Sequence, residues 1–171
     1  TMEPEEISAL YKHPKIKAFI GLAHGEGFGL PVFEAAYYGL PVIAPDWGGV
    51  VDFLYAPKKD KKGKIKKKRH FTKVDYDLKQ VQKEAIWEPI LIKDSMWCFP
   101  RQGSYKMGLR KIYKSYDIAK KEAEKLQKWI LEEFAEDIKY GGFVSAMEEV
   151  IAPSVDDSDV EELFNSLFEE E

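Results

Sequence analysis

The first third of the chain alternates helical periodicity with short apolar runs. The runs at Ile16–Leu22 and Pro41–Ala44 are nearly continuous in apolar character, as expected of strands that are covered on both faces. Helices are predicted over Glu3–Tyr11 and Leu30–Tyr38, each with a proline in its first turn, and another helix opens at Val50–Leu54. Strand, glycine-rich loop, helix and strand in this order predict the βαβ unit of a parallel sheet.

The pattern of the middle third is less regular. Lys58–Arg69 is almost entirely polar, with Gly63 at its centre, and predicts a solvated hairpin or loop. Phe71–Leu78 alternates apolar and polar positions, which predicts a strand. We expect Ile86–Phe99 to be irregular, with short strands.

Helical periodicity dominates the last third. Helices are predicted over Tyr105–Tyr116, Ile118–Phe134 and Tyr140–Val150, and the second of these has an apolar stripe at spacings of three and four residues. Val160–Phe168 has the pattern of a short acidic amphipathic helix. The predicted fold class is therefore α/β, a Rossmann-like three-layer domain with a parallel sheet and a helical C-terminal part.

Charge is unevenly distributed in this chain of 171 residues, whose formal net charge is −4. Residues 58–73 include ten lysines or arginines and one aspartate, whereas residues 156–171 include eight acidic residues and no basic one. We predict one domain over residues 1–152 with a basic loop or hairpin insertion at 57–73, followed by an acidic, loosely attached tail at 153–171.

Cysteine content and hydropathy limit the class of protein. Cys98 is the only cysteine, which excludes an internal disulfide and a cysteine metal cluster, and we expect it to be a small buried hydrophobic residue. No apolar run reaches the roughly 18 residues of a membrane span, and no leader sequence precedes the first helix. We expect a cytoplasmic protein, with peripheral membrane contact through Lys58–Arg69 left open beside a purely solvated hairpin.

Several common chemistries do not fit the sequence. The glycines at 25, 27 and 29 do not have dinucleotide-binding spacing, because position 30 is leucine, and neither a Walker motif nor a nucleophile elbow is present. The three histidines, at 13, 24 and 70, lack zinc-site spacing. Non-specific contact of the basic run with nucleic acid stays open, but no feature indicates a specific nucleic-acid partner.

The glycine-rich turn at Gly27-Phe28-Gly29-Leu30 precedes a predicted helix. The first amides of a helix have no acceptor within it, and the helix dipole adds partial positive charge there. Glycines allow the backbone to approach a bulky anion closely. The turn therefore favours a diphosphate site at the carboxyl edge of the sheet, although a glycine-rich turn that only reverses the chain has the same composition.

Two carboxylates flank this turn. Glu26 lies in the loop and Glu34 one turn into the helix, with seven residues between them. A carboxylate accepts two hydrogen bonds, which suits the adjacent hydroxyls of a ribose at Glu34 and those of a sugar at Glu26. The alternative is that both are helix-start carboxylates stabilised by the dipole.

The stretch Glu26–Gly49 resembles the signature of retaining glycosyltransferases of family 4, which have the GT-B architecture of two facing Rossmann-like domains. The family pattern is E-x7-E within EGFGLPxxEAxxxGxPVIAxxxGG, and nearly every fixed position is matched. The resemblance is strong over Ile16–Leu54 and general over the helical part. It implies the C-terminal, donor-binding domain.

The resemblance also implies roles for individual residues. Glu26 is the implied catalytic residue that contacts the donor sugar, Glu34 binds the ribose, and the turn gives amides to the diphosphate. The implied donor-binding set is His24, Gly27, Phe28, Gly29, Leu30, Glu34, Gly48 and Gly49. His24 stands where many members have a small hydroxyl residue, and a loop histidine bonded to the backbone is the alternative.

The implied reaction transfers a hexose from a UDP- or GDP-sugar to a glycan, lipid or protein acceptor with retention of configuration. No metal or other cofactor is implied, and the leaving diphosphate can itself act as the base. The basic residues that hold the diphosphate in this family, and the N-terminal acceptor domain, are not in this chain, so we expect weak donor binding and low turnover. A stand-alone nucleotide-sugar-binding module without transferase activity is the second hypothesis.

Overall fold

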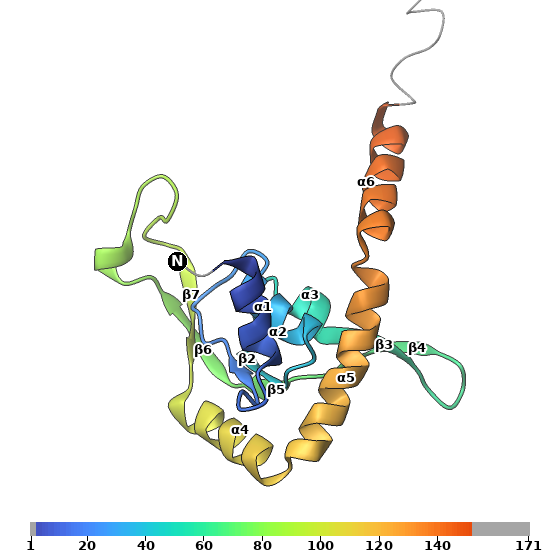
Figure 1. Ribbon diagram of the computed structural model, residues 1–171. Helices are drawn as coiled ribbons and strands as arrows, with labels where there is room; N and C mark the ends of the chain where they lie inside the picture. The colour runs from blue at the N-terminus through green and yellow to red at the C-terminus, as the bar shows by residue number, and fades with distance from the viewer. Residues whose placement is uncertain (1–2, 152–171) are drawn as a thin grey trace, which may run out of the picture. The chain divides into compact units, whose positions relative to one another are not determined.

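The computed structural model describes residues 3–151. The chain forms two compact units, residues 1–131 and residues 132–171, and each is described here by itself. The first unit contains every strand found between residues 3 and 151 and the helices α1 to α4, together with most of α5 (Figure 1).

A three-stranded parallel sheet is the centre of the first unit. Its order is β1 (Phe19–Ile20), β2 (Val42–Pro45) and β5 (Thr72–Val74), with Phe19 beside Val42 and Ile43 beside Thr72. The fold is therefore mixed α/β, as the alternation of helix and strand predicted. β1 is shorter than the predicted strand Ile16–Leu22. Its hydrogen bonds to the next strand run from the amide of Phe19, which donates to the carbonyl of Pro41 (2.9 Å), to the amide of Gly21, which donates to that of Ile43 (3.0 Å).

The helices of the predicted βαβ unit form where the sequence indicated. α1 (Pro4–Lys12) begins with a capping box. The side chain of Glu3 accepts the backbone amide of Glu6, and the side chain of Glu6 accepts the backbone amide of Glu3. α2 (Leu30–Tyr37) ends at Gly39, whose positive φ of 71° favours glycine. α3 (Val51–Leu54) is a single turn.

Helices pack on both faces of the sheet. α4 (Gln102–Lys114) approaches closely at Gly108, where an added Cβ would lie 3.0 Å from the Thr72 methyl group and 3.5 Å from that of Ile43. Ile43, Val74 and Ile112 form the buried core on this face. α2 lies on the other face of the sheet, in contact with β1 and β2. An added Cβ at Gly21, the residue that follows β1, would lie 2.8 Å from the side chain of Val32 in α2.

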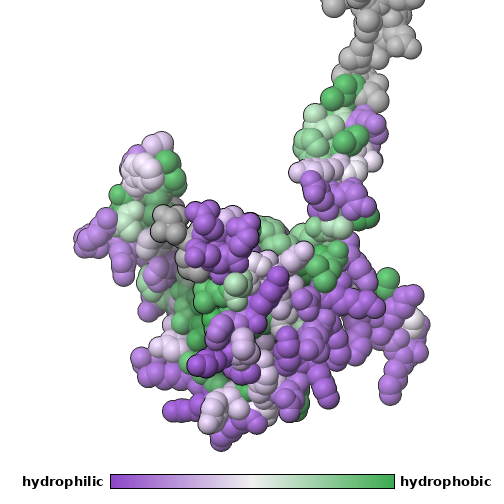
Figure 2. Space-filling view, viewed as in Figure 1, coloured by the Kyte–Doolittle hydropathy of each residue, from purple (hydrophilic) through white to green (hydrophobic). Residues whose placement is uncertain are grey.

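The basic segment forms an antiparallel hairpin between α3 and β5. β3 (Tyr55–Lys59) pairs with β4 (Ile65–Arg69), and the side chain of Asp60 closes the turn by accepting the amides of Lys62 (2.9 Å) and Lys64 (3.0 Å). Figure 2 shows it as a hydrophilic projection, which agrees with the predicted solvated hairpin.

A second antiparallel hairpin corrects the prediction of one strand over Phe71–Leu78. The chain leaves the parallel sheet at Asp75, whose amide bonds the Ser104 hydroxyl and whose carbonyl accepts the Arg101 amide. The following residues form β6 (Tyr76–Gln80), which pairs with β7 (Met96–Pro100), and a short 3₁₀ turn (Lys83–Ala85) lies in the connection. Alternation alone could not show that the strand is divided between two sheets.

α5 (Tyr116–Glu133) has the predicted apolar stripe, in which Ala123, Leu126 and Ile130 are buried. It also fixes the end of α2. The ammonium of Lys120 donates to the carbonyl of Gly39 (2.7 Å), and the amide of the Gln127 side chain donates to that of Tyr37 (2.8 Å).

The described part of the second unit is mainly α6 (Glu136–Ile151). Within this unit, Lys139 forms an ion pair with Glu133 (2.9 Å). Phe143, Val144, Met147 and Ile151 form one apolar face of this helix. The predicted acidic helix at Val160–Phe168 lies outside the described residues. Between residues 3 and 151, no helix is both long and apolar enough to cross a lipid bilayer.

Candidate functional site

The carboxyl ends of β1 and β2 open into two glycine-containing loops and the start of α2. A pocket of about 160 Å³ lies between them, lined by Gly21, Ala23, Gly25, Glu26, Pro31, Val32, Pro45 and Trp47 among others. Ligands of open α/β sheets bind at this edge, because the loops that follow parallel strands meet there. The sequence placed its candidate residues at this edge.

The two glycine loops are in direct backbone contact. The amide of Gly49 donates to the carbonyl of Glu26 (3.0 Å), and an added Cβ at Gly49 would lie 1.8 Å from the carbonyl oxygen of Gly27. Gly48 has a positive φ of 75°, and an added Cβ there would lie 3.0 Å from the Glu26 oxygen. Glycine is therefore required at both positions by this contact, and the second loop holds the first in place.

Gly29 sets the start of α2. Its φ of 85° is left-handed, and its carbonyl accepts the amides of Val32 and Phe33, both at 3.0 Å. Within residues 3–151, neither Gly29 nor Leu30 donates a backbone hydrogen bond to another residue. These amides, with the positive end of the helix dipole, form an environment that favours an anion.

Aromatic packing supports this turn from beneath. The ring of Phe28 lies 5.2 Å from that of Phe33 and 5.1 Å from that of Phe53, which is fully buried. Val50 fills the space beside Gly29, where an added Cβ would lie 2.5 Å from its methyl group. The turn is thus packed against α3, not merely tethered to the strand before it.

Glu26 and Glu34 do not line the same pocket. Glu26 lines the pocket at the carboxyl edge, whereas Glu34 lines a groove of about 410 Å³ between α1 and α2, with Ile7, Leu30 and Tyr38. The first turn of α2 separates the two, because Pro31 lines the first and Leu30 the second. The carboxylates therefore lie on either side of the helix start.

Tyr11 of α1 contacts the helix start beside Glu34. Its hydroxyl donates to the carbonyl of Pro31 (3.2 Å), and burial, followed by the neighbouring Glu34 carboxylate, raises the pKa of Tyr11 to about 12. The phenol is therefore a neutral hydrogen-bond donor at any ordinary pH. The sequence predicted Tyr11 only as the last residue of the first helix, and a role beside Glu34 has no local signal.

His24 joins the glycine loop to β7. Its Nδ1 lies 2.7 Å from the carbonyl of Cys98, and its own carbonyl accepts the Cys98 amide (2.9 Å). The imidazole also stacks on the ring of Trp97, with centroids 4.9 Å apart. His24 is therefore a loop histidine bonded to the backbone, which was the alternative to a donor-binding role. Cys98 is fully buried, as predicted.

Asp46, directly after β2, is the centre of a polar cluster that sequence reasoning did not identify. Its carboxylate accepts from the Tyr55 hydroxyl and the Lys73 ammonium, each at 2.9 Å, and its carbonyl accepts from the Tyr76 hydroxyl (3.2 Å). The hydrogen bond to Asp46 raises the pKa of Lys73, and burial and then Asp46 raise that of Tyr55. The position of Asp46 at a strand's carboxyl end was the only available signal.

Residues 1–68 match the family model of glycosyl transferases group 1. The matched segment includes both glycine loops, Glu26 and Glu34, and it ends within β4. No curated protein matches significantly, and neither does any solved structure. The match supports a general role in glycosyl transfer, with a sugar donor and an acceptor as substrates.

Proposed function

We propose, starting from the match of residues 1–68 to the group 1 glycosyl transferases, that this chain is the donor-binding, C-terminal domain of a retaining GT-B enzyme. The donor is a nucleoside diphosphate hexose, with uridine or guanosine as the nucleoside, and the acceptor is a glycan, lipid or protein. The observation that supports this best is the start of α2, where Gly29 and Leu30 present amides between two carboxylates in separate pockets.

An elongated donor fits this arrangement. In the proposal the hexose lies beside Glu26, the diphosphate lies against the first amides of α2, and the ribose hydroxyls bond to Glu34. The contact between the two glycine loops fixes the distance from the sugar pocket to the helix start before any ligand arrives. Backbone amides that are held in place before the ligand binds stabilise developing charge without a cost of reorganisation during the reaction.

The chemical step breaks the bond between the anomeric carbon and the diphosphate oxygen and forms one to the acceptor oxygen on the same face. The acceptor's proton passes to the leaving diphosphate, which balances the reaction without a further base. The helix start stabilises the negative charge that develops on that leaving group. The Glu26 carboxylate positions the sugar by accepting hydrogen bonds from its hydroxyl groups. No metal ion or other cofactor takes part in this proposal.

The ribose role of Glu34 is tested by measuring UDP, GDP and ADP affinities calorimetrically. Glu34→Ala should weaken the preferred nucleotide by ~1.5–3 kcal/mol, as expected for a lost hydrogen bond to a charged group. Glu84→Ala, which removes an exposed carboxylate outside both pockets, is the matched control. An unchanged affinity in the Glu34 variant would remove this role.

The sugar role of Glu26 is separable from that of Glu34. Glu26→Ala should leave the affinity for the free nucleotide unchanged and weaken only the corresponding sugar nucleotide. Equal losses for both ligands would contradict the assignment.

A stand-alone nucleotide-sugar-binding module without transferase activity is the second candidate, and it depends on the same helix start and the same two carboxylates. Both candidates predict donor binding. Transfer of hexose by the protein together with a second Rossmann-like domain supports the enzyme, and donor binding without transfer in that assembly supports the module.

A further inference from the structure

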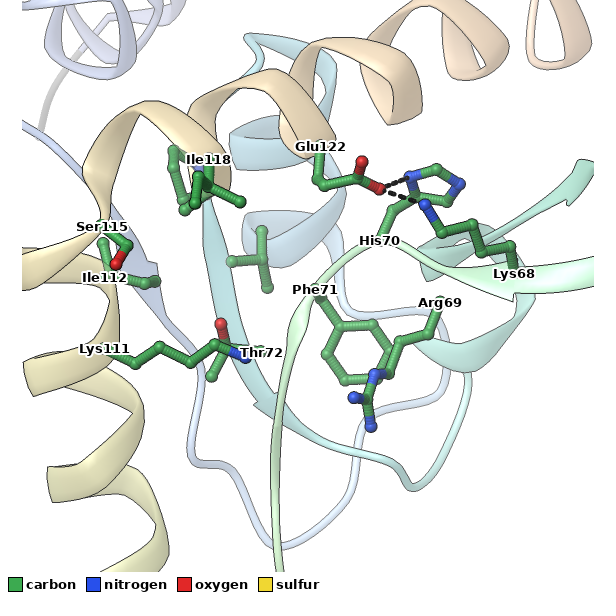
Figure 3. Close-up of a pocket in the computed structure, with 13 residues that line it drawn as sticks. Lys68, Arg69, His70, Phe71, Thr72, Lys111, Ile112, Ser115, Ile118 and Glu122 are labelled. Carbon is green, nitrogen blue, oxygen red and sulfur yellow. Dashed lines mark hydrogen bonds and ion pairs between the residues drawn. The ribbon is translucent and has the colours of Figure 1, made fainter.

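A pocket with several basic lining residues lies at the opposite edge of the parallel sheet, where β2 and β5 begin. It encloses about 420 Å³ and is lined by residues of β2, β4, β5, α4 and α5 (Figure 3). Pro41 and Thr72 mark the amino ends of the strands, so this pocket is separated from the glycine loops by the length of the sheet.

Two cations at this pocket are not neutralised by the protein. Arg69 of β4 and Lys111 of α4 reach toward it from different elements, and neither forms an ion pair with any carboxylate of residues 3–151 (Figure 3). The single carboxylate in the lining, Glu122, is already bound by Lys68 (2.6 Å) and Lys125 (2.5 Å). The pocket therefore has an excess of positive charge.

A buried imidazole lies in the same lining. The side chain of His70 is only 6% exposed, and its Nδ1 faces the Glu122 carboxylate at 3.3 Å (Figure 3). Glu122 is therefore surrounded by groups of the protein itself.

The start of α5 also faces the pocket. The carbonyl of Ser115 accepts the amides of Ile118 and Ala119, each at 3.2 Å, so Ser115 is the last residue before the helix, and its hydroxyl belongs to the lining. The positive end of the helix dipole thus lies on the same side as Arg69 and Lys111. Serine and threonine hydroxyls, here Ser115 and Thr72, are common partners of phosphate oxygens.

The remaining lining is apolar. Phe71 and Ile112 are buried, and Ala119 and Ile118 complete the wall toward α5. We propose that this pocket binds a phosphate group joined to an apolar body, with Arg69 and Lys111 on the phosphate oxygens and the wall of Phe71, Ile112 and Ala119 against the apolar part. An arginine fork matches phosphate geometry and a lysine supplies a second point charge.

Such a ligand has two sources, a soluble phosphate ester or the headgroup of an anionic lipid. The path of the chain favours a lipid headgroup, because β4 leads directly from the exposed lysines of the hairpin to Arg69. Lysines near an anionic bilayer are attracted to its surface, which would bring the pocket to the surface of a vesicle.

The test uses the full chain and two kinds of probe. Phenyl phosphate and inorganic phosphate are titrated calorimetrically, and vesicles of phosphatidylcholine with and without phosphatidic acid are used in a sedimentation assay. The variant Arg69→Ala with Lys111→Ala is compared with Arg110→Ala and Lys114→Ala, which removes the same two residue types from exposed positions outside the lining. Circular dichroism verifies that both variants are folded.

Phenyl phosphate should bind more tightly than inorganic phosphate, and the pocket variant should weaken it about tenfold while the control variant leaves it unchanged. Binding of acidic vesicles with the same sensitivity identifies a lipid as the source, and binding of phenyl phosphate alone identifies a soluble ester. Replacing Lys61 and Lys62 by glutamine should reduce vesicle binding only. No saturable binding of any probe, or equal losses in the two variants, would overturn the proposal.

Discussion

The two edges of the parallel sheet are built by different means. At the carboxyl edge the geometry is set by backbone contact, since Gly49 lies against Gly27 with no room for a Cβ. At the amino edge the geometry is set by long side chains, with Lys68, His70 and Lys125 gathered around Glu122. A backbone contact tolerates almost no change of residue, whereas a charged cluster tolerates conservative exchange.

This contrast explains why the first edge has a sequence motif and the second does not. The glycine loops are formed within one short stretch, residues 24–49, so their spacing is visible in the sequence. The amino-edge pocket combines residues from 41 to 122, and only the fold brings them together.

The largest expected effect comes from breaking the backbone contact. Gly49→Ala places a Cβ 1.8 Å from the Gly27 oxygen, so the two loops must separate. We expect a loss of about 3 kcal/mol in the free energy of unfolding, measured by urea denaturation, together with loss of nucleotide binding. The control is Gly103→Ala, because an added Cβ there meets no atom within 4 Å. Similar stabilities of the two variants would contradict the importance of the contact.

The amino edge should respond to acid. Hydrogen bonds from Lys125 and then Lys68 lower the pKa of Glu122 from 4.5 to about 2. The stabilisation that the ionised Glu122 carboxylate gives to the folded state is therefore complete above about pH 4.5 and is lost as the pH falls toward 2. Burial and then Lys68 lower the pKa of His70 from 6.5, so its protonation below that pH also favours unfolding.

Glu122→Gln should therefore cost ~1.5 kcal/mol at neutral pH and flatten the acid limb of the stability profile measured by thermal unfolding. Glu124→Gln, which removes a weak ion pair with Lys120 at 3.9 Å, is the matched control and should cost less than ~0.5 kcal/mol. An acid limb that persists unchanged in the Glu122 variant would show that other groups are responsible.

The smallest effect tests whether side chains also matter at the carboxyl edge. Tyr11→Phe removes the hydroxyl that bonds the Pro31 carbonyl beside Glu34, and it should cost about 1 kcal/mol in unfolding free energy. Nucleotide affinity should fall by less than in Glu34→Ala. Tyr113→Phe, at a position that is 89% exposed, is the control and should match the parent protein in both measurements.

Much of the first unit could be predicted from local pattern. The prolines at the starts of α1 and α2, the glycine at 39 and the apolar stripe of α5 are local signals, and these helices form where they were predicted. The division of the predicted strand Phe71–Leu78 into β5 and β6 was hidden, because Thr72–Val74 is only three residues long and a second strand follows directly after Asp75.

The candidate site was only partly predictable. The positions of Glu26 and Glu34 on either side of the helix start follow from their spacing, but their separation into two pockets does not. Tyr11 and β7 reach the site from elements with no motif, through bonds to Pro31 and His24. Their contributions depend on tertiary packing, which a single sequence does not encode in any local spacing.

The basic hairpin leaves and rejoins the domain at one point, since Tyr55 pairs with Arg69 at its base. A projection attached in this way can be shortened, lengthened or recharged without disturbing the register of β2 and β5. The length and charge of the hairpin can thus change independently of the glycine loops, and replacing residues 58–67 with a tight turn is a practical route to a form of the protein that lacks most of its basic projection.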